Sequence, residues 1–193
     1  SFNCQAACGR VELHKPGFGT SKFFNLVRWA LTKDVALLQE VHGTPHDLEL
    51  LYQQVALTHV LVYSLSPNRR AGTVVVLISR AIIKGDFTIH CHEVVPGRVM
   101  VVTVASDFGM FQVANAHLLP EWSLAYKSVV LRDLHKRILK PDLSCCILGG
   151  DFNFLELGEF AHDGNFDELK WTSQALSRVF AETFKGFSEF LSR

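Results

Sequence analysis

The sequence has no excess of charge of either sign, because its 193 residues carry 19 lysines and arginines against 19 aspartates and glutamates. This balance excludes the strongly basic composition that is typical of domains binding nucleic acid through their overall charge. It leaves room for a local basic groove or a metal site. Hydrophobic residues make up 48% and charged residues 20%, so extended disorder is excluded as well.

The sequence lacks a cysteine pattern typical of disulfides or zinc, although it has five cysteines. The number is odd, Cys145 and Cys146 are adjacent, and no pair has C-x-x-C spacing. Free thiols in a reducing compartment are expected instead. No apolar run reaches the roughly 18 residues that a membrane-spanning helix needs, and no secretory signal is present. We therefore expect an intracellular protein, nuclear or cytoplasmic, with no membrane partner.

The length predicts a single domain over residues 1–193, since domains usually take about 100–200 residues. Such a chain can bury a core without disulfide or metal staples. The sequence begins Ser1-Phe2-Asn3 rather than with methionine. We expect it to be a fragment that is truncated at both ends. Nothing in the sequence indicates an obligate protein partner.

Apolar periodicity predicts mixed strands and helices. In the first part of the chain the expected elements are a helix over 21–33 capped by Ser21, a strand over 34–41, a helix beginning at Thr44-Pro45 and a strand over 60–65. Four consecutive strands, expected to be antiparallel, follow over 73–83, 87–95, 98–105 and 110–116. A helix over 121–140 ended by Pro141, a strand over 144–150 and a helix from Thr172 complete the order. The fold class is mixed α and β, with a largely antiparallel core and helices outside.

The helix over 121–140 carries the clearest apolar stripe. Its members are Trp122, Tyr126, Val129, Val130, Leu134 and Ile138. Residues at this spacing share one face of a helix. We expect that face to pack on a sheet.

Polar residues suited to metal or acid–base chemistry follow apolar strands at four places. They are Asn3, Glu40, Asn115 with His117, and Asp151 with Asn153. Neighbouring strands can bring such ends together. Two carboxylates, amides and a histidine suit Mg²⁺ better than zinc, because Mg²⁺ takes one or two carboxylates and keeps waters for a phosphate. Taken singly, each residue has a structural explanation: a solvated glutamate, turn-forming Asp and Asn, or a core histidine.

The successive motifs resemble those of the endonuclease/exonuclease/phosphatase superfamily, the deoxyribonuclease I-like fold. They are S-F-N-C, L-L-Q-E-V-H, G-x-V-V-V-L-I-S-R, V-P-G-R-V, V-A-N-A-H-L and I-L-G-G-D-F-N, from Ser1 to about Leu155. The G-D-F-N-F-L and R-R-A-G-x-V-V-V-L-I-S-R segments are also similar to endonuclease domains of non-LTR retroelements. The histidine at 117 departs from many retroelement members, which have tyrosine there.

The resemblance implies a four-layer sandwich of two mostly antiparallel sheets flanked by helices, incomplete at its C-terminal end. It also implies Mg²⁺-dependent hydrolysis of phosphate esters, with Mn²⁺ as a substitute. Glu40 would be the main metal ligand with Asn3 beside it, and Asp151 would orient or deprotonate the attacking water. Asn153, Asn115 and Arg98 would contact the substrate phosphate, and His117 would help the leaving group. For Arg98, a plain surface charge is an equal alternative.

One family motif is missing from the sequence. Members of the superfamily carry a late S-D-H strand whose histidine is the general base, and no S-D-H follows Asp151. His162-Asp163 is the one histidine and acid pair there, and we interpret it as a loop. Low activity is therefore expected for these residues, because a positioned general base contributes about 10²–10⁴-fold.

The sequence leaves several functions open. The first expectation is a nucleic-acid endonuclease, with DNA as the substrate and Arg69, Arg70, Arg80 and Arg98 as a local basic rim. For Arg69-Arg70, a solvated loop is an equal alternative. The alternatives are a non-catalytic retroelement remnant, a plain interaction domain, or the same fold acting on another phosphate ester. That ester would be a phosphoinositide, a sphingolipid, poly(A) or phosphotyrosyl-DNA.

Overall fold

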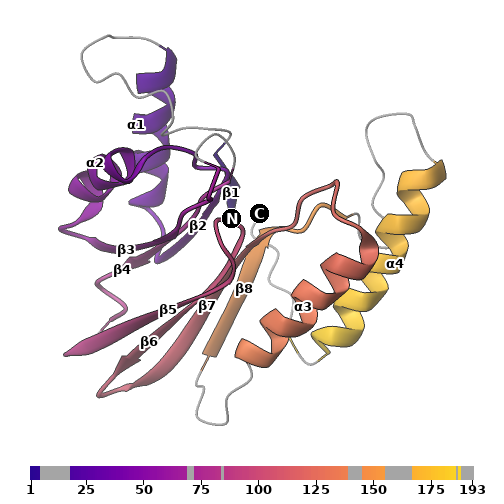
Figure 1. The fold of residues 1–193 in the computed structure, drawn as a ribbon. Helices are drawn as coiled ribbons and strands as arrows, with labels where there is room; N and C mark the ends of the chain where they lie inside the picture. The colour runs from indigo at the N-terminus through magenta and orange to yellow at the C-terminus, as the bar shows by residue number, and fades with distance from the viewer. Residues whose placement is uncertain are drawn as a thin grey trace.

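Two four-stranded sheets, packed face to face, form the centre of the molecule (Figure 1). The computed structural model describes residues 1–4, 18–68, 72–83, 85–138, 145–154, 167–185 and 187. The strands are β1 (Phe2–Asn3), β2 (Val35–Gln39), β3 (His59–Ser64), β4 (Val74–Ser79), β5 (Phe87–Val95), β6 (Val99–Ser106), β7 (Gly109–His117) and β8 (Cys145–Asp151). The helices are α1 (Phe18–Ala30), α2 (Pro45–Val55), α3 (Leu124–Ile138) and α4 (Asp167–Thr183).

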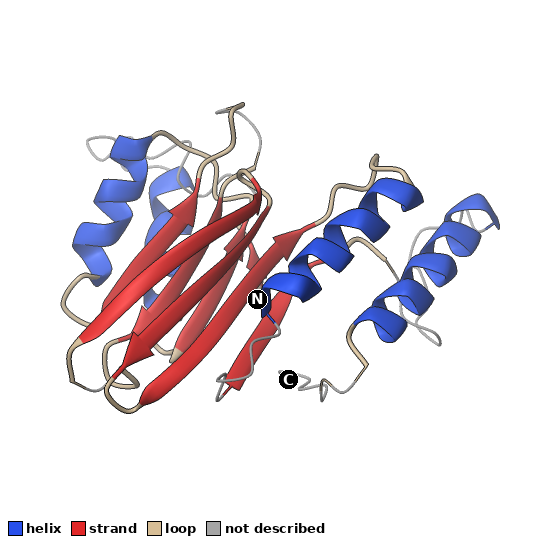
Figure 2. Ribbon diagram, turned by 60° about the horizontal axis from the view of Figure 1, so that its bottom comes forward, coloured by secondary structure: helices blue, strands red, loops and turns tan. Residues whose placement is uncertain are grey.

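The first sheet, called sheet A, has the strand order β1-β2-β4-β3, and the second, called sheet B, has the order β5-β6-β7-β8. The pairs β1–β2 and β7–β8 are parallel, whereas all other neighbours are antiparallel. Helices α1 and α2 lie on the outer side of sheet A, whereas α3 lies beside sheet B and α4 packs on the far side of α3 (Figure 2). The expected four-layer sandwich is confirmed.

Strand β4 shows why a continuous apolar run belongs at the centre of such a sandwich. All six of its residues are buried. Val75 and Leu77 join the cluster under α1 and α2, whereas Val76 and Ile78 join the cluster between the two sheets. A strand covered on both faces needs apolar residues at every position rather than at every second one.

The expected run of four consecutive antiparallel strands needs one correction. All four strands exist, but β4 lies in sheet A between β2 and β3, and only β5, β6 and β7 are consecutive neighbours. The connections β5–β6 and β6–β7 are tight turns, which keep antiparallel strands adjacent. The longer segment between Ser79 and Phe87 carries the chain from one sheet to the other.

The helices agree with the sequence pattern in type and differ at their ends. Thr44 caps α2 through a capping box with Asp47, as its sequence indicates. Helix α1 begins at Phe18 rather than after a cap at Ser21, and α3 begins at Leu124 rather than at 121. Pro141 lies outside the described residues. None of the helices in the described ranges is long and apolar enough to cross a membrane.

The face that α3 buries differs from the expected stripe. Val130, Leu134 and Ile138 are buried as expected, together with Leu131. Tyr126 and Val129 are 44% and 49% exposed, so their assignment to the core was wrong. Tyr126 instead packs edge-on against Trp122, with ring centroids 4.9 Å apart. The buried face lies one residue further along the helix than the stripe predicted.

Candidate active site

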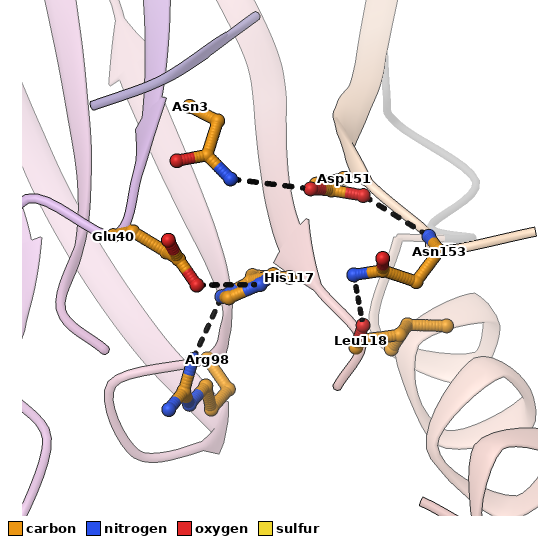
Figure 3. A network of polar contacts seen from close by, with 7 residues as sticks. All are labelled: Asn3, Glu40, Arg98, His117, Leu118, Asp151 and Asn153. Carbon is orange, nitrogen blue, oxygen red and sulfur yellow. Dashed lines mark hydrogen bonds and ion pairs between the residues drawn. The ribbon is translucent and has the colours of Figure 1, made fainter. Parts of the chain in front are cut away.

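The polar strand ends meet at one end of the sandwich, where β1 and β2 of sheet A face β7 and β8 of sheet B. Figure 3 shows Asn3, Glu40, Arg98, His117, Asp151 and Asn153 gathered there by a network of polar contacts. Parallel pairing places Asn3 beside Gln39, the residue before Glu40, and places His117 beside Asp151. The convergence expected from the sequence is therefore observed for these residues.

Two contacts connect the sheets directly through the site. The side-chain amide nitrogen of Asn3 donates to Asp151 Oδ2 over 3.3 Å, across 148 residues of sequence. Glu40 Oε1 lies 3.4 Å from His117 Nε2. Each contact joins a residue of sheet A to one of sheet B, so the geometry of the site depends on how the sheets are packed.

The backbone around Glu40 adopts an unusual conformation. Glu40 has a φ of 51° and Thr73, on the neighbouring chain segment, has a φ of 70°. Positive φ is uncommon for residues other than glycine and a genuine outlier for a β-branched one. Such conformations persist where the surrounding structure enforces them, and they concentrate at functional sites. Here the turn carries the Glu40 carboxylate beyond the strand end and toward His117.

Arg98 is the last residue of the turn that begins at Pro96, and its guanidinium contacts the His117 ring at the nitrogen that does not face Glu40. Its Nη1 lies 2.8 Å from His117 Nδ1. Because a guanidinium only donates, His117 Nδ1 must accept, so the neutral ring carries its proton on Nε2, the nitrogen that faces Glu40. Arg98 is only 9% exposed, which excludes the alternative of a plain surface charge.

Burial and charge favour a neutral His117. Burial lowers the pKa of His117 below its ordinary value and the Arg98 charge lowers it further, whereas Glu40, Asp151 and Glu121 oppose this shift. Burial also lowers the pKa of Arg98, against the effect of Glu40 and Glu121. An influence of Glu121 on the site was not expected from the sequence, which placed this residue at the start of the helix over 121–140.

The G-G-D-F-N segment is shaped by its two glycines. A Cβ on Gly150, whose φ is 148°, would lie 1.9 Å from the carbonyl oxygen of Ala116, and one on Gly149 would lie 2.6 Å from a methyl group of Leu37. At Gly150 only glycine permits the approach to the backbone, whereas at Gly149 a larger residue would displace the Leu37 side chain. The segment then turns, with Asp151 Oδ1 accepting from the Asn153 backbone N–H over 3.1 Å.

Asn153 is anchored at the same turn. Its side-chain nitrogen donates to the carbonyl oxygen of Leu118 over 2.7 Å, and its φ is 49°. The side chain is exposed, at the edge of the site next to Asp151 (Figure 3). A residue placed in this way can reach a bound substrate without a change in the strands.

Asn115 is placed differently from the sequence prediction. It is fully buried between the sheets, where its amide nitrogen donates to the carbonyl oxygens of Leu38 and Val75 over 3.0 and 2.9 Å. Its oxygen accepts from Gln39 Nε2 over 2.6 Å. A side chain with these partners has no hydrogen left for a phosphate, so the assigned phosphate contact is corrected.

Gln39 is the residue that sequence reasoning missed. It is 1% exposed, although glutamine is rarely buried without a partner. A polar residue on the inward face of an otherwise apolar strand was the available signal. His162, Arg69 and Arg70 lie outside the described residues.

The donor set at the strand ends fits a hard divalent cation. The Glu40 carboxylate, the Asn3 amide oxygen and the Asp151 carboxylate are all oxygen ligands, which Mg²⁺ prefers. Within the described part of the chain, no group of three or more His, Cys, Asp or Glu side chains is placed to hold a metal ion, so an ion here would depend on amide oxygens and water as well. An arrangement with few protein ligands leaves positions for water and a phosphate, as Mg²⁺ requires.

The family follows from the sequence as a whole. The model of the Endonuclease/Exonuclease/phosphatase family matches residues 1–182. The chain belongs to this family. A search of curated proteins found no match.

This member of the endonuclease/exonuclease/phosphatase family shares its fold with proteins of known structure. A humanized TDP2 of D. rerio with 14 mutations is 16% identical with a TM-score of 0.50, over 68% of this chain and 58% of that chain. ANGEL2, a 2′,3′-cyclic phosphatase, is 18% identical with a TM-score of 0.51, over 70% and 44%. The endonuclease domain of TRAS1, a telomere-specific non-LTR retrotransposon, is 15% identical with a TM-score of 0.51, over 81% and 64%. The matched region spans about half the length of these structures.

Proposed function

We propose that this chain is a Mg²⁺-dependent phosphodiesterase that cleaves nucleic acid, with DNA as the first expected substrate. The observation that carries the proposal is the meeting of Glu40 and Asp151, from different sheets, around His117. Family membership supports hydrolysis of a phosphate ester. The choice of nucleic acid is supported by the fold shared with the TRAS1 endonuclease domain.

Each residue of the site has a chemical task in this proposal. Glu40 and the Asn3 oxygen would hold Mg²⁺, which when bound stabilises the charge that develops on the phosphate. Asp151 orients the attacking water and takes its proton. Its position is fixed from two sides, by Asn3 and by the backbone of Asn153.

Two donors remain for the phosphate and the leaving group. His117 carries its proton on Nε2 and can donate that hydrogen to a phosphate or leaving oxygen that replaces Glu40 as its partner. Asn153 offers a second amide hydrogen at the edge of the site. No S-D-H sequence follows Asp151 within these 193 residues, and slow turnover is expected when they are assayed alone.

The test is nicking of supercoiled plasmid with Mg²⁺, beside a chromogenic phosphodiester, a 2′,3′-cyclic nucleotide and a phosphomonoester. Asp151→Asn should lower diester hydrolysis by about 10²–10⁴-fold. Glu40→Gln should weaken Mg²⁺ binding in titration calorimetry. The exposed residues Asp133 and Glu49 supply the matched controls Asp133→Asn and Glu49→Gln, which should leave both properties unchanged.

Three results would count against the proposal. Equal Mg²⁺ affinity in Glu40→Gln and the parent would remove the metal assignment. Nicking that survives Asp151→Asn would point to a contaminating nuclease or another base. Hydrolysis of the cyclic nucleotide or the monoester without plasmid nicking would replace nucleic acid by another phosphate ester as the substrate.

A further inference from the structure

The surface between the two sheets changes character toward the active site. Away from the site, the contact between the sheets is apolar and includes Leu37 of β2 and Val113 of β7. Two residues further along each strand, on the same faces, the residues are Gln39 and Asn115. The apolar row therefore ends in a buried polar pair just before Glu40 and His117.

This polar pair satisfies backbone groups as well as each other. The pairing of β2 with β4 ends at Leu38 opposite Val75, and Asn115 donates to the carbonyl oxygens of both residues. Beyond Glu40 the hydrogen bonds resume one residue out of step, from the Val41 N–H to the Thr73 oxygen. The Asn115 amide of sheet B thus bonds the backbone at the register shift between β2 and β4, where the turn at Glu40 begins.

Gln39 connects the same point to the first strand. Its backbone oxygen accepts from the Cys4 N–H over 2.7 Å, directly after Asn3, while its side chain donates to Asn115 over 2.6 Å. Through Gln39 the ends of β1, β2 and β7 are held together, and β8 follows β7 through their parallel register. Each of β1, β2, β7 and β8 therefore either contains a residue of this pair or is hydrogen-bonded to a strand that does.

We propose that the Gln39–Asn115 pair is a positioning lock that fixes the alignment of sheet A on sheet B at the active site. Apolar packing is non-directional and tolerates small shifts between the sheets, whereas hydrogen bonds require a defined geometry. The lock sets the separation of Asn3 and Glu40 from His117 and Asp151 without contacting the substrate. This inference rests on the proposed phosphodiesterase function, although its structural part can be tested alone.

The variant that tests the lock is Gln39→Met. Methionine has a similar length and fills a buried space, but it cannot donate to Asn115, and the two bonds from Asn115 to Leu38 and Val75 remain possible. The matched control is Gln112→Met, because Gln112 is a second buried glutamine, on β7 and outside the site, bonded to Thr103 and the Arg137 carbonyl. If Gln39→Met does not fold, Gln39→Asn tests the same lock by shortening the reach of the amide.

The first measurement does not depend on activity. In metal-free protein, NMR should show shifted resonances at Glu40, His117 and Asp151, and faster exchange of the Cys4 and Val41 amides, in Gln39→Met. The Gln112→Met control should leave these signals in place even if it melts at a similar temperature. Unchanged site resonances in Gln39→Met would overturn the lock.

The second measurement separates positioning from binding. With saturating Mg²⁺ and a chromogenic phosphodiester, Gln39→Met should lower kcat by about 10- to 100-fold with little change in KM, because misplacement of reacting groups by about 1 Å costs a factor of this size. A loss of kcat no larger than that of Gln112→Met would overturn the lock. If the parent hydrolyses no diester, the proposed function fails, and the NMR result still decides whether the pair aligns the sheets.

Discussion

His117 combines burial, a cationic neighbour and a carboxylate, and these give it a testable dependence on pH. Its pKa in the folded protein lies below the ordinary value of 6.5, so the unfolded chain binds its proton more readily. The free energy of unfolding should therefore fall as the pH drops through about 6.5, by at most about 1.4 kcal/mol per pH unit for one proton. Above that range the histidine is neutral in both states and contributes no slope.

The measurement is urea unfolding at pH 7.5 and pH 5.5 in buffer with a chelator, for the parent and His117→Gln. The variant should lose less stability between the two values than the parent. The matched control is His46→Gln, because His46 is exposed on α2. An identical slope in the parent and His117→Gln would show that the ring is not held neutral.

Adjacent thiols at the start of β8 should differ in reactivity. Burial, with a smaller effect of Cys145, raises the pKa of Cys146 to about 11 from 9.0. Its thiolate is then about 100-fold rarer at neutral pH than that of an unshifted thiol, and the thiolate is the form that reacts. Cys145 is exposed. Mass spectrometry after brief iodoacetamide treatment should find the label on Cys145 first, and equal labelling would contradict the burial of Cys146.

The sequence predicted the positions of some residues of the site and not those of others. Glu40, Asp151 and His117 could be placed because they follow strands in motifs of a known order. The structure brings them together, and their catalytic roles stay predictions. From the sequence, Asn115 could not be distinguished from a phosphate-binding residue. The sequence does not show that its amide donates to backbone carbonyl oxygens of the other sheet. Gln39 was missed for the same reason.

At the scale of elements, α3 gives the clearest expectation for stability. Leu134 is fully buried against sheet B, and Leu134→Ala should lower the free energy of unfolding by about 2–5 kcal/mol, from lost burial and the cavity left behind. Leu57, in the turn after α2, is 95% exposed and supplies the matched control. Urea unfolding should show almost no change for Leu57→Ala. Similar midpoints for the two variants would mean that α3 does not hold the core.

Helix and strand types followed from local patterns, whereas the ends and the buried faces did not. The T-P-H-D sequence predicts the start of α2 because cap and partner lie within one turn. The face of α3 that is buried depends on how the helix packs on sheet B. It includes Lys127, which the apolar pattern of the sequence could not predict to be buried. Burial lowers the pKa of that lysine, against the effect of Glu121.

At the scale of the whole molecule, the sequence could not predict which strands belong to which of the two sheets. Strands β4 and β5 are consecutive and both rich in β-branched residues, yet they belong to different sheets. Local propensity is the same for either arrangement. What decides is the burial of β4 on both faces, which only the completed sandwich provides.

The shared cluster between the sheets should make the two halves unfold together. Trp29 packs against the cluster of sheet A and Trp122 against that of sheet B. Variants that keep one of these tryptophans, with the other and Trp171 changed to phenylalanine, report each half by fluorescence. We expect coincident urea midpoints, the mark of a two-state transition. Separate midpoints would show that each sheet with its helices is stable alone.

The contact between Asn3 and Asp151 has a consequence for the order of events at the ribosome. It joins residues 148 positions apart. At about 5–20 residues per second, the nascent chain waits about 7 to 30 s between the emergence of Asn3 and that of its partner. During this interval β1 has β2 as a neighbour, and His117 of sheet B can already face Glu40, but the contact from Asn3 to Asp151 cannot yet form. The complete set of strand-end residues can therefore come together only after β8 has emerged, late in synthesis of these residues.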